Sequence, residues 1–268
     1  MTTLPRPTGA SLARRGGFLH DLGSVAVRSL KLIPREPEAI VPALVIPLFF
    51  FAVNVGSLSN VVGGQVPGFD YKAFQLPVAI VFAVTGVSRA VQLVVDIQDG
   101  YWDRMLLSPM NRWAILLGCM AADFVLVVAL SVPVVAVGLI VGVEFAAGAT
   151  GIALFLLLAG LWGVAANGLV YAIALKTGSP AAVNASFVVF FPFYFLTTAF
   201  APLEALSGWL EAVARLNPVT YLLDGLRALI IEGWVWSEIA KGLGAIAVLG
   251  AISQTLAFLA MRGRLRQH

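Results

Sequence analysis

Residues 114–141 read AILLGCMAADFVLVVALSVPVVAVGLIV and contain a single charged side chain, Asp123. A membrane-spanning helix needs about 20 predominantly apolar residues, so this stretch is long enough to cross a bilayer. The whole chain of 268 residues has the same character, because 60% of it is hydrophobic and only 12% is charged. Soluble domains carry about 25% charged residues. The composition therefore excludes an ordinary soluble enzyme and predicts an all-α polytopic membrane protein.

Five further stretches meet the same length criterion, so six transmembrane helices are predicted. These stretches are 39–59, 73–95, 151–175, 181–201 and 239–260. The segment 202–238, before the last stretch, is apolar in places but contains too many charged residues for a helix that faces lipid. We expect it to form two short helices broken at Asn217-Pro218, as an outer-side helical hairpin that lies at the interface or re-enters the membrane.

The distribution of Lys and Arg predicts the orientation, because cytoplasmic loops are enriched in these residues. Six spans place both chain ends on one side, and that side collects Arg6, Arg14, Arg15, Arg28, Lys31, Arg35, Arg89, Arg104, Arg112, Lys176, Arg262, Arg264 and Arg266. The opposite side has Lys72, Arg215, Arg227 and Lys241. Both termini are therefore expected in the cytoplasm. Residues 1–37 would form the N-terminal segment, 38–262 a single transmembrane domain and 263–268 a basic tail.

Residues 17–33 have the pattern of an amphipathic helix at the cytoplasmic interface. One face collects Phe18, Leu22, Val25, Ser29 and Ile33, and the other collects Asp21, Arg28 and Lys31. Two interpretations remain open for this helix: a simple membrane anchor, or an anchor that also touches a cytoplasmic partner. No apolar run suited to a signal peptide lies in the N-terminal segment, so cleavage is not expected.

Sequence motifs for catalysis are missing. The chain contains no P-loop, no His-Glu-x-x-His and no Gly-x-Ser-x-Gly motif. Its one cysteine, Cys119, and its two histidines, His20 and His268, are far apart in sequence. We therefore expect this chain to be no enzyme and to bind no cofactor or metal of its own.

Two charged residues lie well inside predicted spans, Asp123 in the third and Arg89 near the inner end of the second. Ionisable groups at this depth are costly, so they either pair with one another or mark a transport route. We expect Arg89 and Asp123 to form an intramembrane charge pair that holds the second and third spans together. A direct role of Asp123 in transport is the alternative.

The predicted cytoplasmic coupling loop, residues 96–113, reads DIQDGYWDRMLLSPMNRW. Gly100 can open a turn and Pro109 can end a helix, so the spacing predicts a short helix over 101–107. Trp102, Met105 and Leu106 share one face of that helix, which could fit a groove on a soluble partner. The alternative is an interfacial turn with Trp102 among the lipid headgroups.

The loop carries the pattern Asp-x-x-x-Gly-x-x-Asp-Arg-x-x-x-x-Pro-x-x-Arg, formed by Asp96, Gly100, Asp103, Arg104, Pro109 and Arg112. This pattern resembles the ABC-2 type permeases, and within them the drug exporters of the daunorubicin-resistance type. A Leu-Ala-Asp of that family corresponds to Ala121-Ala122-Asp123. The segments Trp209-Leu210-Glu211-Ala212, Asn217-Pro218-Val219-Thr220-Tyr221 and Asp224-Gly225-Leu226-Arg227 resemble the family before its last span.

The resemblance implies the permease subunit of an ABC exporter in the plasma membrane of a bacterial cell, which moves an amphiphilic drug, lipid or lipid-linked product. It implies a second permease subunit, identical or related, and two separate ATPase subunits that bind the ATP and Mg. Residues 100–112 would be the coupling helix that docks into the ATPase. Its coupling residues would be Trp102, Asp103, Arg104, Met105, Pro109 and Arg112, with Trp102 and Met105 filling the cleft of the ATPase.

The fifth predicted span offers a candidate cargo face. Asn184, Phe187, Phe191, Tyr194 and Thr198 are spaced by three or four residues, which places them on one side of a helix. Helix packing is the alternative role of such an aromatic stripe. Two other functions also remain open at this point: an ion-coupled secondary transporter, which usually needs several intramembrane carboxylates, and a membrane subunit that only anchors or assembles other proteins.

Overall fold

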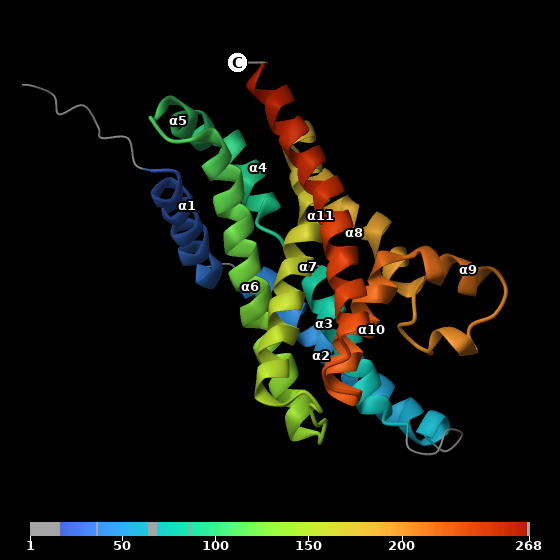
Figure 1. Cartoon of the computed structure of the whole chain (residues 1–268). Coiled ribbons are helices and arrows are strands. Elements are labelled where there is room, and N and C mark those ends of the chain that lie inside the picture. The colour runs from blue at the N-terminus through green and yellow to red at the C-terminus, as the bar shows by residue number, and fades with distance from the viewer. Residues whose placement is uncertain (1–16, 36, 64–68, 86, 267–268) are drawn as a thin grey trace, which may run out of the picture.

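The structure is a computed structural model that describes residues 17–35, 37–63, 69–85 and 87–266. Within these ranges all regular secondary structure is helical, as predicted. In chain order the helices are α1 (Phe18–Leu32), η1 (Ile33–Arg35), α2 (Pro37–Gly63), α3 (Tyr71–Thr85), α4 (Ala90–Gln98), α5 (Tyr101–Leu107), α6 (Arg112–Ile140), α7 (Gly148–Thr177), α8 (Pro180–Phe195), η2 (Leu203–Ala205), α9 (Trp209–Leu216), α10 (Pro218–Ile231) and α11 (Trp236–Leu265) (Figure 1).

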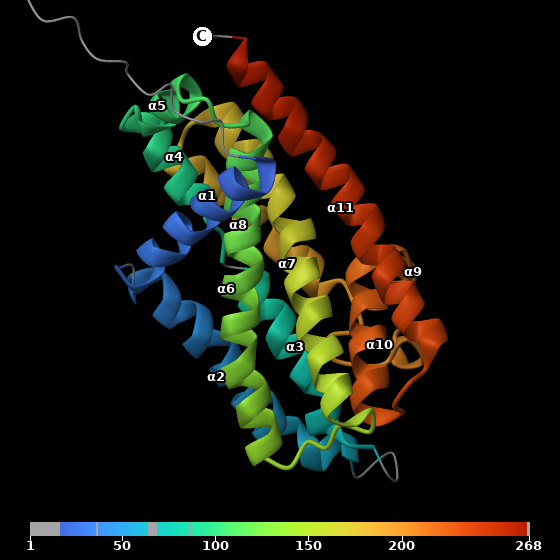
Figure 2. The same ribbon diagram turned by 60° about the vertical axis from the view of Figure 1, so that its left-hand side comes forward.

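Four of the described helices, α2, α6, α7 and α11, are long and apolar enough to cross a membrane. The helices α6, α7 and α11 have 29, 30 and 30 residues, which correspond to about 45 Å at 1.5 Å per residue and exceed a bilayer core of about 30 Å. They run side by side through the bundle (Figures 1 and 2). Two further apolar helices, α3 and α8, are shorter.

The prediction of one continuous second span over 73–95 is wrong. The structure divides it into α3, which ends at Thr85, and α4, which begins at Ala90. In both views α3 lies toward the end of the bundle that holds the α6–α7 turn, and α4 lies toward the end that holds α5. The residues between the two helices are poor helix formers, because position 86 is a glycine and Ser88 can bond to nearby backbone.

The predicted fifth span over 181–201 is also too long, because α8 ends at Phe195. The predicted break at Asn217-Pro218 is confirmed, since it separates α9 from α10. Asn217 accepts a hydrogen bond from the backbone N–H of Val219 at 3.0 Å, and Pro218 occupies the first turn of α10. Both features are typical of a helix start. In Figure 1, α9 projects from the side of the bundle while α10 packs within it.

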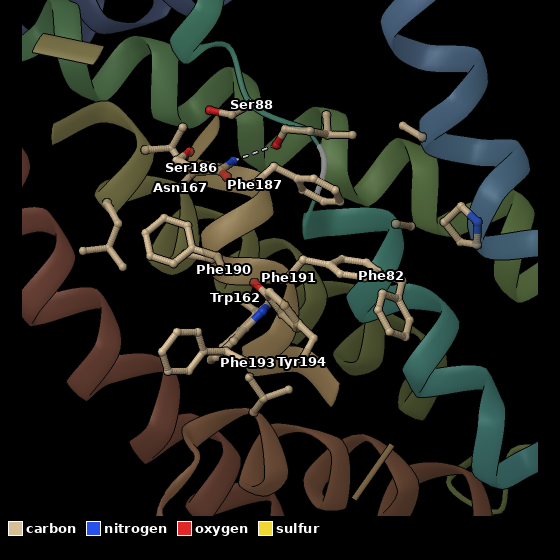
Figure 3. Close-up of a pocket in the computed structure, with 18 of the residues that line it drawn as sticks. Phe82, Ser88, Trp162, Asn167, Ser186, Phe187, Phe190, Phe191, Phe193 and Tyr194 are labelled. Atoms are coloured by element: carbon tan, nitrogen blue, oxygen red, sulfur yellow. Dashed lines mark hydrogen bonds between the residues drawn. The ribbon is translucent and has the colours of Figure 1, made fainter. Parts of the chain in front are cut away.

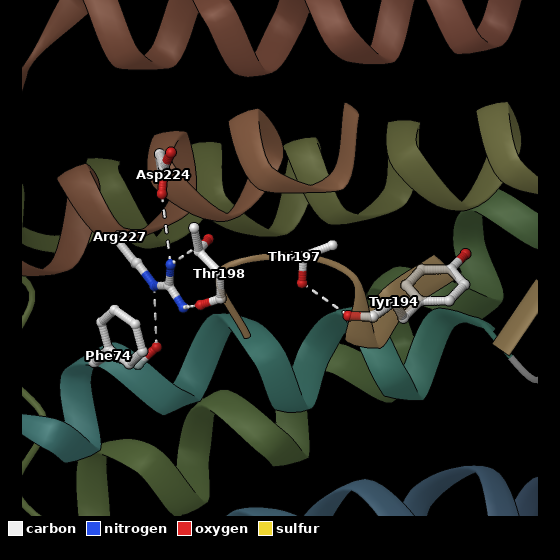
Figure 4. A network of polar contacts seen from close by, with 6 residues as sticks. All are labelled: Phe74, Tyr194, Thr197, Thr198, Asp224 and Arg227. Atoms are coloured by element: carbon white, nitrogen blue, oxygen red, sulfur yellow. Dashed lines mark hydrogen bonds and ion pairs between the residues drawn. The ribbon is translucent and has the colours of Figure 1, made fainter. Parts of the chain in front are cut away.

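Arg227 of α10 joins three segments of the chain (Figure 4). Its guanidinium donates hydrogen bonds to the carbonyl oxygen of Phe74 in α3 at 3.2 Å, and to the carbonyl and hydroxyl oxygens of Thr198 at 2.7 and 2.9 Å. It also lies 3.5 Å from the centre of the Phe74 ring and 3.4 Å from a carboxylate oxygen of Asp224. Arg227 therefore fixes the end of the α8 segment against α3 and α10.

Replacing Arg227 with Met is expected to lower the free energy of unfolding by about 2–3 kcal/mol, because two buried carbonyl groups lose their donor. Arg215→Met is the matched control. Arg215 is 62% exposed and pairs with Glu211 on the same helix, so its loss should cost less than about 0.5 kcal/mol. Denaturant titration of the purified variants in detergent measures both effects. Equal stability of the two variants would contradict the anchoring role of Arg227.

Candidate functional site

The helix α5 lies on a corner between α4 and α6. The predicted bounds of this helix, 101–107, are confirmed. Gly100 has a φ of 69°, a left-handed backbone conformation that glycine adopts without strain, and this lets the chain turn from α4 into α5. In Figures 1 and 2 α5 lies at the same end of the bundle as the C-terminal end of α11. The short helix is therefore held at one end of the molecule.

The apolar face of α5 is turned toward its own bundle. Trp102 is 1% exposed and Met105 is 8% exposed. Both belong to a buried cluster that includes Leu93 of α4 and Ile115 and Leu116 of α6. The expectation that Trp102 and Met105 fill the cleft of a partner is corrected by this burial, because neither side chain can be reached from outside. They instead fix α5 to α4 and α6.

The outer face of α5 is formed by other residues. Leu107 is 88% exposed, an unusual position for a large apolar side chain next to charged ones. Arg104, Pro109 and Arg112 are also exposed, and Asp103 is partly exposed. We call these five residues the α5 face. Four of them were predicted as coupling residues from the sequence, whereas Leu107 was not singled out.

The helix α1 is joined to this corner by an ion pair. Two guanidinium nitrogens of Arg28 donate to the two carboxylate oxygens of Asp96 in α4, each at 2.8 Å. Hydrogen bonding to Asp96 and its negative charge raise the pKa of Arg28 above its usual value. The same guanidinium lies 4.0 Å from the centre of the Tyr101 ring in α5. A bidentate ion pair fixes the relative orientation of its two side chains as well as contributing energy. The pair therefore holds α1 against α4 and α5.

A second contact joins α1 to the start of α6. Asp21 is 5% exposed and accepts a hydrogen bond from the backbone N–H of Asn111 at 2.9 Å. Asp21, Val25 and Ser29 are the buried residues of α1. The sequence pattern placed Asp21 and Arg28 on the face opposite the apolar one, and in the structure both of them form hydrogen bonds to the rest of the protein. The position of this helix at the cytoplasmic interface stays a prediction. Leu19 and Val27, 79% and 50% exposed, face outward.

A large groove lies between α2, α3, α7 and α8, and the start of α10 closes one end (Figure 3). Its volume is about 910 Å³. Aromatic side chains dominate its wall: Phe50, Phe82, Trp162, Phe187, Phe190, Phe191, Phe193 and Tyr194. None of the described residues that line it is charged. A mainly apolar concavity with a few polar groups is typical of a site for small amphiphilic molecules.

Four of the five predicted cargo-face residues line this groove, namely Asn184, Phe187, Phe191 and Tyr194. The ring of Phe191 lies 5.3 Å from that of Phe187 and 5.9 Å from that of Phe82. Thr198 does not share their helical face, because α8 has already ended and Arg227 holds Thr198. The opposite wall of the groove contains Phe82 of α3 and Trp162 of α7. The spacing of residues within the predicted fifth span carries no information about these two side chains, so they were not predicted.

Asp123 of α6 lies beside the break between α3 and α4 and is completely buried. It accepts hydrogen bonds from the backbone N–H of Arg89 at 2.8 Å, from the hydroxyl of Ser88 at 3.2 Å and from the amide nitrogen of Asn167 in α7 at 3.0 Å. The same amide nitrogen donates to the carbonyl oxygen of Val87 at 2.9 Å. Asp123 and Asn167 therefore satisfy backbone groups that the break releases.

Arg89 and Asp123, the predicted charge pair, are joined in the structure by a hydrogen bond from the backbone N–H of Arg89 to the carboxylate of Asp123. An ion pair between the two side chains stays a prediction. Unwound backbone within a membrane is tolerated only where protein or a cavity surrounds it. Here Val87 and Ser88, both inside the break, also line the aromatic groove. Asp123 and Asn167, which form hydrogen bonds to the break, therefore lie at one end of that groove, and Asn167 is part of its lining.

The amino-acid sequence matches one known family over most of the described helices. The family model described as ABC-2 type transporter matches residues 20–231, a range that begins within α1 and ends with α10. This chain belongs to the ABC-2 type transporter family. Its class is therefore that of the membrane subunits of ABC transporters.

Several relatives carry names from drug resistance. The chain is 24% identical over 206 residues to the daunorubicin resistance ABC transporter permease protein DrrB1 of Streptomyces coeruleorubidus, which covers 76% of this chain and 72% of that protein. It is 25% identical over 206 residues to the probable doxorubicin resistance permease DrrC of Mycobacterium tuberculosis, covering 76% and 74%. It is also 25% identical over 230 residues to the putative transport permease ycf38 of Cyanophora paradoxa, covering 82% and 78%.

Proposed function

We propose that this chain is the permease subunit of an ABC exporter that moves an amphiphilic drug, lipid or lipid-linked product out across the plasma membrane of a bacterial cell. Six crossings are formed by α2, by α3 with α4, by α6, by α7, by α8 and by α11, and the short helices α9 and α10 form the outer-side element before the last crossing. Both termini lie in the cytoplasm. Two ATPase subunits bind the ATP and Mg, and a second permease subunit, identical or related, completes the pathway.

The observation that carries this proposal is the exposed α5 face on a rigidly held corner. The buried Trp102 and Met105 join α5 to the bundle, so a force on the α5 face moves α4 and α6 with it. The Arg28–Asp96 pair adds α1 to the same unit. A packed unit of this kind transmits the closure of an ATPase as rigid-body motion, whereas a flexible loop would absorb it.

Charge supports the placement of this corner in the cytoplasm. Arg104 lies in α5 and Arg112 begins α6, Lys176 lies in the last turn of α7, and Arg262 and Arg264 lie in the last turn of α11. All these segments gather at one end of the bundle in Figures 1 and 2. An excess of Lys and Arg is characteristic of the cytoplasmic side of membrane proteins.

The aromatic groove supports a cargo of amphiphilic character. It opens beside α2 and α8 rather than forming an enclosed core cavity, and its described lining is uncharged. An ion-coupled carrier is less well supported, because Asp123 is engaged by three donors and does not line the groove.

Reconstitution tests the proposed function. The genes that neighbour this one are first searched for a P-loop ATPase, and the chain is then purified with that candidate partner and placed in proteoliposomes. We expect no ATP hydrolysis from the chain by itself, and ATP-dependent movement of an amphiphile when both are present. Ion-driven movement without ATP would favour a secondary carrier instead, and no movement under either condition would favour an anchoring role.

Phe191→Ala is expected to change cargo preference, with a loss of about three- to tenfold in transport of aromatic cargo, because the ring of Phe191 packs beside those of Phe82 and Phe187 inside the groove. Phe145→Ala is the control, since Phe145 packs against Phe155 away from the groove. Competition between aromatic and aliphatic cargo in vesicles measures the change. Unaltered selectivity in the Phe191 variant would assign the aromatic stripe to packing.

A further inference from the structure

One end of the aromatic groove is polar. Ser88 from the α3–α4 break, Asn167 of α7 and Ser186 of α8 line it together (Figure 3). Asn167 is 3% exposed and Ser186 is 6% exposed, so their hydrogen-bonding capacity is committed mainly within the protein. Each of these side chains has a fixed number of hydrogen-bond donors and acceptors, and those not used within the protein are available to a ligand in the groove.

Asn167 presents its oxygen and not its nitrogen. The amide nitrogen has two hydrogens, and both are used, by the carbonyl oxygen of Val87 and by the carboxylate of Asp123. These two partners are acceptors, so the amide orientation is fixed by the network and cannot be reversed without loss of both bonds. The group of Asn167 that is left over is a carbonyl oxygen, which can only accept.

The two serines have the same remaining capacity. The hydroxyl of Ser88 donates to Asp123 at 3.2 Å and accepts from the backbone N–H of Ala90 at 3.2 Å. The hydroxyl of Ser186 donates to the carbonyl oxygen of Val183 at 2.6 Å. Each hydroxyl has one hydrogen, and that hydrogen is used within the protein. The lone pairs that remain are acceptors.

We infer that this end of the groove binds the hydrogen-bond-donating end of an amphiphile, with a primary or secondary ammonium as the preferred group, while the aromatic wall holds its apolar body. Asp123 acts as a positioning residue, because its carboxylate holds the hydrogens of Ser88 and Asn167 away from the groove. This deepens the proposed function and rests on it for the identification of the ligand as cargo.

The surroundings favour a cation over an anion. The neighbouring aromatic rings, among them Phe187 and Phe190, carry negative charge on their faces and attract ammonium groups. An anionic head at the same place would meet oxygen lone pairs, with no Lys, Arg or His among the described residues that line the groove. We therefore expect a phosphate- or carboxylate-bearing amphiphile to bind this end less tightly than an ammonium-bearing one.

Four ligands that share one pyrene body test the inference: pyrenebutylamine, its trimethylammonium derivative, pyrenebutanol and pyrenebutyric acid. The full chain in lipid nanodiscs is titrated without nucleotide, and energy transfer from tryptophan to pyrene reports binding against empty nanodiscs. We expect the primary amine to bind about tenfold more tightly than the trimethylammonium compound, which has the charge without the donors. The alcohol should bind more tightly than the acid.

Ser186→Ala is expected to weaken binding of the primary amine about three- to tenfold and to leave the trimethylammonium compound unchanged. Ser131→Ala is the matched control, because Ser131 is a buried serine that also bonds to its own helix, to Val127, but does not line the groove. Because Ser186 bonds only to its own helix in this network, its loss should leave folding intact, and circular dichroism checks this.

Equal binding of both cations, or tightest binding of the acid, would overturn the inference. So would an unchanged preference in the Ser186 variant. The binding assay needs no ATPase, so its result is separate from that of the reconstitution. If the chain exports cargo with ATP but binds the primary amine and the trimethylammonium compound equally, only the ligand assignment is contradicted. If it prefers the primary amine but no ATP-driven movement is seen, only the proposed function is contradicted.

Discussion

Leu107→Glu combined with Arg104→Glu is expected to reduce ATP-dependent export at least about tenfold and to remove the ATPase from the purified complex. The reason is that Leu107, at 88% exposed, is the most prominent apolar side chain of the α5 face and Arg104 lies beside it. A few residues carry most of the binding energy of an interface, Arg is enriched among them, and single losses reach about 2 kcal/mol or more. A Glu at position 107 would also place an unpaired charge in a contact that Leu107 makes with apolar surface. Copurification of the ATPase and vesicle transport measure the two effects.

Ile140→Glu is the matched control for this pair. Ile140 is 84% exposed, close to the value for Leu107, but it lies at the other end of α6, away from α5. Its replacement should leave the ATPase bound. Asp103→Ala with Arg104→Ala is a milder variant that should weaken coupling while membrane insertion stays normal. Full export and full ATPase recovery in the Leu107 and Arg104 variant would contradict the coupling role of α5.

Asp123→Leu is expected to lower the free energy of unfolding by about 3–5 kcal/mol and to stop transport, because three buried donors lose their acceptor at once. The replacement is close in size, so the effect reports hydrogen bonding more than lost volume. The released donors include the backbone N–H of Arg89, within the break between α3 and α4. We expect this break to rearrange and the polar end of the groove to change with it.

Asp123→Asn should recover only part of the stability, because its amide keeps one acceptor oxygen but turns a nitrogen toward other donors. Asp103→Asn makes the same chemical change at a partly exposed position and should be close to neutral. Denaturant titration in detergent gives the stabilities, and pyrenebutylamine binding gives the state of the groove. A stable, transport-competent Asp123→Leu variant would show that the break holds its shape without the carboxylate.

Short sequence motifs predicted helix boundaries correctly where a boundary depends only on residues close by in the sequence. Gly100 and Pro109 bound α5 as predicted, and Asn217-Pro218 begins α10 as predicted, because turn and capping preferences act within a few residues. The long apolar runs of α6, α7 and α11 gave helices for the same reason. Burial of a continuous apolar stripe needs no information from distant parts of the chain.

The errors all involve partners that are far away in sequence. Apolar residues flank 86–89 on both sides, and the acceptor that stabilises the break there is Asp123 on another helix. The spacing of the cargo face continues to Thr198, but Arg227 of α10 holds that residue outside the helix. The amphipathic pattern of α5 correctly indicated a buried face, although it could not show that the chain's own α4 and α6 cover Trp102.

The proposed coupling role requires contact between the α5 face and a nucleotide-hydrolysing partner in the cytoplasm. A photoreactive benzophenone amino acid placed at position 107, with position 140 as the comparison, measures this contact in intact cells. We predict a covalent adduct from position 107 to a P-loop ATPase subunit and none to it from position 140. Adducts to lipid alone from position 107, or labelling of that position by an impermeant reagent outside the cell, would contradict the account.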